Sequence, residues 1–94
     1  MEIRFYEDPD TGQPHIYVHG VTEQEVEEVL RGPGEDLRGT RDSRRKIGQT
    51  RAGRYLQVFY VSDEDPEGVF VITALEPRGK AKRAFRRRQR RKPK

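Results

Sequence analysis

The strongest constraint on the fold of this 94-residue chain is a series of three strand-like runs joined by short connections. The runs cover about residues 43–50, 54–62 and 69–75, and the last two are rich in β-branched and aromatic residues. Connections at 51–53 and 63–68 are too short for a crossover helix, so consecutive runs are expected to pair antiparallel. Because the last two runs are apolar on both faces, they are expected inside the sheet, with 43–50 at an edge.

A helix is predicted over residues 23–31 by its start signals and by its apolar spacing. Thr22 and Glu25 match a capping box, in which each side chain bonds the backbone N–H of the other residue. An apolar stripe at i, i+3 and i+4 follows, made of Val26, Val29 and Leu30. Gly32 and Pro33 then end the helix.

The remaining segments complete an α+β prediction. Residues 3–6 can begin a strand, 7–12 form a turn-rich loop, and 34–40 are expected to be a loop. Residues 14–18 fit either a short extended segment or helical turns between Pro14 and Gly20. A second helix is predicted from about residue 79, with Ala81, Ala84 and Phe85 at helical spacing.

These elements predict one small domain, a small antiparallel sheet of three to four strands flanked by two helices. The domain is expected to cover residues 1–85, and residues 86–94 to form a basic, flexible C-terminal tail.

Charge is strongly segregated along the chain. Residues 1–36 hold 10 acids against Arg4 and Arg31, whereas residues 38–54 hold seven bases against Asp42. Residues 78–94 hold 11 Lys or Arg and no acid. The two basic zones indicate an anionic partner if the fold brings them together. The alternative is an acidic domain with a basic tail that only promotes solubility.

Several functional classes are excluded by composition. The chain contains no cysteine, which excludes disulfides, thiolate metal sites and a cysteine nucleophile, and a cytoplasmic location is expected. No signal peptide or membrane span is expected, because the longest apolar runs have four residues. The glycine-rich segments 32–34 and 48–53 do not match a nucleotide-binding loop, so no nucleotide cofactor is expected.

Two histidines raise the question of a metal site. His15 and His19 would share a face in a helix, but would lie about 13 Å apart in an extended segment. No third ligand accompanies them at a recognisable spacing, so no metal is predicted. His19 remains a candidate general acid or base, since histidine titrates close to neutral pH.

The hairpin of residues 44–55 has the composition of an RNA-binding surface. Its cations lie close in sequence to Tyr55 and Tyr60, a combination that can hold phosphates and stack bases. Alternation places Arg44 and Lys46 on one face of the strand and Arg45 on the other. Alternatively, these cations pair with the acids of residues 1–36 and serve the fold alone.

Five motifs occur together in order: 19–22 (HGVT), 25–30 (EVEEVL), 48–50 (GQT), 53–56 (GRYL) and 71–74 (VITA). Over about residues 15–90 this series resembles the BrnT-like toxins of bacteria and an allied family of small proteins. The resemblance implies a RelE-type fold, a small antiparallel sheet flanked by helices. BrnT-like proteins open with a helix, whereas Pro9, Gly12 and Pro14 disfavour one here.

The same resemblance implies a metal-independent endoribonuclease of the toxin–antitoxin type, with RNA as substrate and a cognate antitoxin protein as partner. Arg54 and Lys46 would then stabilise charge on the phosphate, and His19, Tyr60 or a lysine would handle the proton. RNA would be bound by Arg44, Arg45, Arg83, Arg86 and Arg87. A non-catalytic RNA-binding or protein-interaction module of the same fold is the alternative. In a third alternative, a scaffold with no nucleic-acid role, Arg54 pairs with an acid such as Asp42 or Glu76 and serves stability alone.

Overall fold

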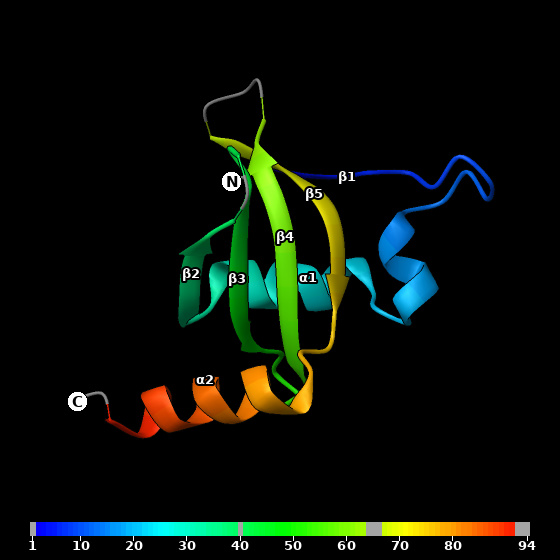
Figure 1. Cartoon of the computed structure of the whole chain (residues 1–94). Coiled ribbons are helices and arrows are strands. Elements are labelled where there is room, and N and C mark those ends of the chain that lie inside the picture. Colours follow the sequence, from blue (N-terminus) through cyan, green and yellow to red (C-terminus); the bar gives the residue numbers. More distant parts are fainter. Residues whose placement is uncertain (1, 40, 64–66, 92–94) are drawn as a thin grey trace.

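The computed structural model describes residues 2–39, 41–63 and 67–91. Its elements in chain order are β1 (Glu2–Phe5), the 3-10 helix η1 (His15–His19), α1 (Glu23–Arg31), β2 (Gly34–Arg38), β3 (Arg44–Gln49), β4 (Tyr55–Ser62), β5 (Gly68–Leu75) and α2 (Gly79–Arg91). Within these residues the strands form one mixed sheet in the order β1-β5-β4-β3-β2. Figure 1 shows α1 behind the sheet and α2 across one end of it.

The described sheet contains five strands, so the prediction of three or four was wrong. Residues 34–38, predicted to lie in a loop, form β2 and pair antiparallel with β3. β2 therefore occupies the edge, and β3, predicted as the edge strand, lies inside the sheet. The sequence of β2 has little strand propensity, and its backbone is held by pairing with β3. Gly34 permits this pairing, because a Cβ there would collide with the carbonyl oxygen of Ile47.

The sheet is also mixed rather than purely antiparallel. β1 pairs with β5 in parallel, with Ile3 opposite Val69. The 62 residues from 6 to 67 separate these two strands, so no tight turn imposes an antiparallel pairing on them. The predicted antiparallel hairpins from β3 to β4 and from β4 to β5 are confirmed.

The predicted helix over residues 23–31 is confirmed as α1, together with its capping box. The Thr22 hydroxyl accepts from the Glu25 N–H at 3.1 Å, and the Glu25 carboxylate accepts from the Thr22 N–H at 3.0 Å. The C-terminal helix begins at Gly79, as predicted, and continues to Arg91. Residues 86–91, predicted to belong to a flexible tail, are therefore helical. Between Pro14 and Gly20 the chain forms helical turns, one of the two alternatives, and Gly20 ends them with a φ of 70°.

The hydrophobic core lies between α1, η1 and one face of the sheet, called here the inner face. Its buried members are Ile16, Val21, Val26, Val29, Leu56, Val58, Tyr60, Val71 and Ala74. The opposite, outer face is covered at one end by α2, whose Phe85 is 3% exposed and meets Tyr55 edge-on at 6.0 Å between ring centroids. Across the described parts of the chain, no helix is long and apolar enough to cross a membrane.

Candidate nucleic-acid interface

The four predicted catalytic residues fall into two separate groups. Arg54 lies just before β4, and its guanidinium bonds the carbonyl of Gly20, the neighbour of His19. Lys46 and Tyr60 lie farther along the sheet, on the α1 side of β3 and β4. Arg54 and Tyr60 are separated by on the order of 20 Å of extended strand. The fold therefore does not bring all four side chains to one phosphate.

Arg54 is held by groups from three parts of the chain. Its Nε donates to Glu76 at 2.8 Å, and its Nη1 donates to the Gly20 carbonyl at 2.9 Å and to the Glu25 carboxylate at 3.0 Å. The Glu76 hydrogen bond is the main reason that the pKa of Arg54 is raised. The contact with Glu76 is the structural pairing considered from sequence, and together the three contacts link the start of α1 and the end of η1 to the residue that follows β5.

The carboxylate of Glu25 serves both Arg54 and the capping box. Burial acts to raise its pKa, but hydrogen bonds from the Thr22 N–H and from Arg54 outweigh burial and hold the pKa below its usual value. Glu25 is therefore a charged acceptor that fixes the start of α1 to the start of β4.

His19 lies at the end of η1, exposed, with its ring edge-on to His15 at 5.5 Å between centroids. His15 in turn contacts the Asp8 carboxylate through Nδ1 at 3.2 Å. The helical turns thus place the two imidazoles in contact. No group of three or more metal-ligating side chains occurs in residues 2–39, 41–63 and 67–91.

Lys46 is directed toward the C-terminal end of α1. Its Nζ donates to the carbonyls of Leu30 at 2.9 Å and Gly32 at 2.6 Å, satisfying two oxygens that the helix leaves unpaired. Burial lowers the pKa of this ammonium group.

Tyr60 and Arg44 meet at Asp36, on the same side of the sheet as Lys46. The Tyr60 hydroxyl donates to Asp36 at 2.6 Å, and Arg44 donates to the other carboxylate oxygen at 3.1 Å. Burial and the Asp36 hydrogen bond raise the pKa of Tyr60. The predicted RNA-binding residue Arg44 is thus paired with an acid, whereas Arg45 projects on the opposite face, as alternation predicted.

Three other predicted RNA-binding residues are exposed on α2. This helix contains no acid, and besides Arg88 its exposed cations are Lys80, Arg83, Arg86, Arg87, Arg90 and Arg91. Besides the Phe85–Tyr55 contact, Arg88 bonds both carboxylate oxygens of Glu35 at 2.6 Å. Lys82 and Arg86 lie 4.9 and 5.9 Å from the centroid of the Tyr55 ring. α2 is therefore a docked helix with its cationic side toward solvent.

A second group of arginines lies at the far end of the sheet. Arg38, Arg41 and Arg44 line a hollow of about 780 Å³ beside the β2–β3 connection, together with Asp42 and the end of β4. The fold thus brings the two basic zones of the sequence, residues 38–54 and 78–94, together only in part. One lies along α2, and much of the other lies at the opposite end of β3 and β4.

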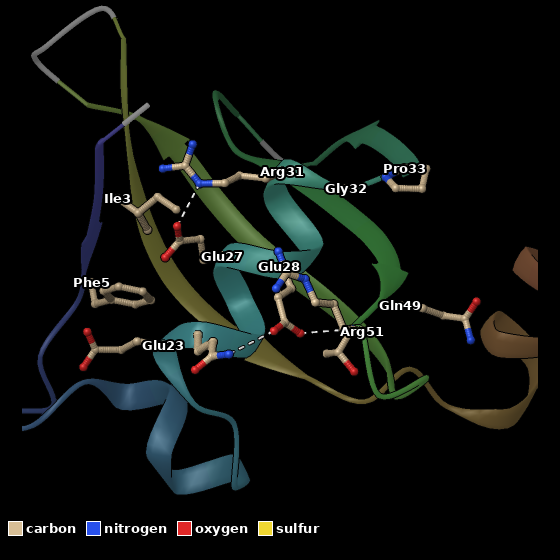
Figure 2. A pocket seen from close by; sticks show the side chains of 12 residues that line it. Ile3, Phe5, Glu23, Glu27, Glu28, Arg31, Gly32, Pro33, Gln49 and Arg51 are labelled. Carbon is tan, nitrogen blue, oxygen red and sulfur yellow. Dashed lines mark hydrogen bonds and ion pairs between the residues drawn. The ribbon is translucent and has the colours of Figure 1, made fainter.

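A larger hollow of about 950 Å³ runs between α1 and β1. Figure 2 shows Ile3 and Phe5 on one side of it and the carboxylates of α1 on the other. These carboxylates are already bonded within the protein: Glu27 accepts from Arg31 at 2.9 Å, and Glu28 accepts from the Arg51 N–H at 3.0 Å. The hollow therefore has little in common with a phosphate-binding site.

The aromatic residues proposed from sequence as base-stacking partners are covered. Tyr60 is 8% exposed and faces the core, and Tyr55 lies under Phe85 and Lys82 of α2. Phe59 and Phe70 instead lie on the outer face, since their neighbours in β4 and β5 point into the core. Alternation in the sequence places Phe59 and Phe70 on that face, where both are half-buried by their neighbours and α2 lies across the other end of the sheet (Figure 1).

Comparison with known proteins adds no assignment to this geometry. The chain matches no protein-family model, no curated protein and no solved structure.

Proposed function

We propose that the protein binds RNA through the exposed cationic side of α2. The observation that carries this proposal is the charge of the helix: Gly79–Arg91 has eight Lys or Arg and no acid, and one of the eight, Arg88, is paired with Glu35. The phosphate backbone of RNA is a regular polyanion that such a row of cations neutralises, releasing bound counterions.

The geometry favours binding over cleavage. Arg54, Lys46 and Tyr60 each bond to protein groups that hold α1 or β2 in place. A phosphate would have to displace these contacts, at a cost in stability, before any of the three could act on it. We therefore propose that the protein binds RNA without cleaving it. The endoribonuclease activity implied by the resemblance is tested by looking for cleavage in the assay below.

As the resemblance implies, we also propose a RelE-type fold, a cytoplasmic location and an antitoxin-like protein as a second partner. Support comes from the antiparallel core of β3, β4 and β5 with helices on both sides. Copurification of the protein with the product of a neighbouring gene would test the protein partner.

The experiment is a salt titration of RNA binding. Anisotropy of a labelled 20-nucleotide single-stranded RNA would be followed between 50 and 200 mM KCl. If the six exposed cations of α2 other than Arg88 each neutralise a phosphate, the logarithm of affinity should fall with a slope of about −4 against the logarithm of salt concentration. Affinity would then fall about 300-fold over this range. No binding at 50 mM would overturn the proposal.

A matched pair of variants locates the surface. Arg83, Arg86 and Arg87 changed together to Gln should weaken the slope by about 2. Changing Arg4, Arg31 and Arg51 to Gln removes the same charge from exposed positions outside α2 and should weaken the slope much less. Equal losses in both would refute a specific role for α2. Gel analysis of the same mixtures would reveal cleavage, which would instead favour the endoribonuclease.

A further inference from the structure

The part of the outer sheet face that α2 leaves uncovered is an unusual surface for a small protein. Phe59 and Val61 of β4 and Phe70 of β5 lie on it, half-buried, opposite the core-facing residues of the same strands. Figure 1 shows α1 on the far side of the sheet and α2 only across its lower end. Apolar and aromatic side chains on an open face of a sheet indicate a binding surface.

Charge around this face indicates an anionic occupant. Arg45 lies on the face itself, directly across from Phe59 in the β3–β4 register. α2 lies across one end of the face (Figure 1), and the hollow lined by Arg38, Arg41 and Asp42, to which Val61 also contributes, borders the other. β2 contributes one carboxylate to the face, Glu35, and Arg88 neutralises it.

The two phenylalanine rings lie on neighbouring strands of the same face. Val61 is the direct partner of Phe70, and Phe59 lies two residues before Val61 on the same strand. A β-bulge between Phe59 and Tyr60 interrupts the regular register here, but both rings stay on the outer face. Two aromatic rings on neighbouring strands of one face can each stack one base of an unpaired strand.

We infer that this outer face binds the unstacked bases of single-stranded RNA, with Phe59 and Phe70 as stacking platforms and Arg45 beside them. The inference rests on the proposed function, in which α2 holds the phosphates of the same strand. A duplex is excluded from the face because its bases are already stacked and paired, and it would engage only the cations of α2. The site therefore selects single strands, with little dependence on base identity.

The test uses three labelled probes of equal length: a 12-nucleotide oligouridine, an abasic oligoribonucleotide with the same phosphates, and an RNA duplex. The wild-type protein should bind oligouridine at least about tenfold more tightly than the abasic strand, since each stacked base contributes to affinity. Equal affinity for the two would overturn the inference and leave phosphate binding by α2 intact. Failure to bind any probe would overturn the proposed function itself.

Variants then identify the rings. Phe59→Leu combined with Phe70→Leu keeps apolar side chains on the sheet and should reduce oligouridine affinity to the abasic level, leaving abasic affinity unchanged. The control Tyr6→Leu combined with Tyr17→Leu removes two aromatic rings of 41% and 44% exposure near η1 and should retain the preference. Thermal melts would verify folding. A dimer that the Phe variants dissociate, with unchanged RNA affinity, would identify the face as a protein interface and overturn the inference.

Discussion

Replacing Arg54 with alanine tests whether this residue serves the fold or an RNA phosphate. Its side chain is 27% exposed and bonds Glu25, itself 24% exposed, the Gly20 carbonyl, and the mainly solvated Glu76, 62% exposed. The Glu76 contact is worth little because water surrounds it. The half-buried contacts to Glu25 and Gly20 contribute most, and together the loss should be about 2 kcal/mol of unfolding free energy.

For a domain of this length, about 2 kcal/mol corresponds to a fall in Tm of about 8–16 °C. Circular dichroism melts at pH 7 would measure it. Arg31→Ala is the matched control: it also removes an arginine bonded to a glutamate, but at 48% and 54% exposure, so its cost should stay below about 0.5 kcal/mol. RNA affinity of the folded Arg54→Ala protein should remain close to that of the wild type.

The opposite pattern would refute the reasoning. If Arg54→Ala melted within about 2 °C of the wild type, the contacts to Glu25 and Gly20 would not carry the stability assigned to them. If the wild type also cleaved RNA and the variant lost that cleavage by about 10²-fold or more with binding retained, Arg54 would be catalytic, as the resemblance implies.

Three further predictions concern single contacts. The pKa of Glu25 in the folded protein lies below its ordinary value of 4.5. The stability that its charged form contributes is therefore present above pH 4.5 and is lost as the pH falls through the lower folded-state pKa. The difference in Tm between wild type and Glu25→Gln should shrink in acid, and a constant difference would contradict this. Lys46→Met should lower the free energy of unfolding, measured in urea, by about 1–2 kcal/mol, because the carbonyls of Leu30 and Gly32 lose their donor. An unchanged urea midpoint would argue against this role of Lys46. Gly34→Ala should cost about 1–3 kcal/mol and increase hydrogen exchange in β2, because the added Cβ meets the Ile47 carbonyl; unaltered exchange would rule out the close pairing.

Local elements were predictable because their signals lie within a few residues of one another. The capping box of α1 spans Thr22 to Glu25, and the β3–β4 and β4–β5 hairpins follow from connections too short for anything else. The alternation that buries Val58 and Tyr60 and turns Phe59 outward could also be read directly from the sequence. These features need no knowledge of distant segments.

Tertiary structure decided the rest. β2 has a sequence suited to a loop and is a strand because it pairs with β3. β1 pairs with β5, which begins more than 60 residues farther along the chain. Arg54 bonds three residues that lie 22, 29 and 34 positions away along the chain. Its structural role therefore could not be predicted from the residues next to it in sequence. Likewise, the position at which Phe85 docks α2 determines which half of the outer face remains open. Each of these outcomes depends on packing between segments far apart in sequence, which local propensity and periodicity do not encode.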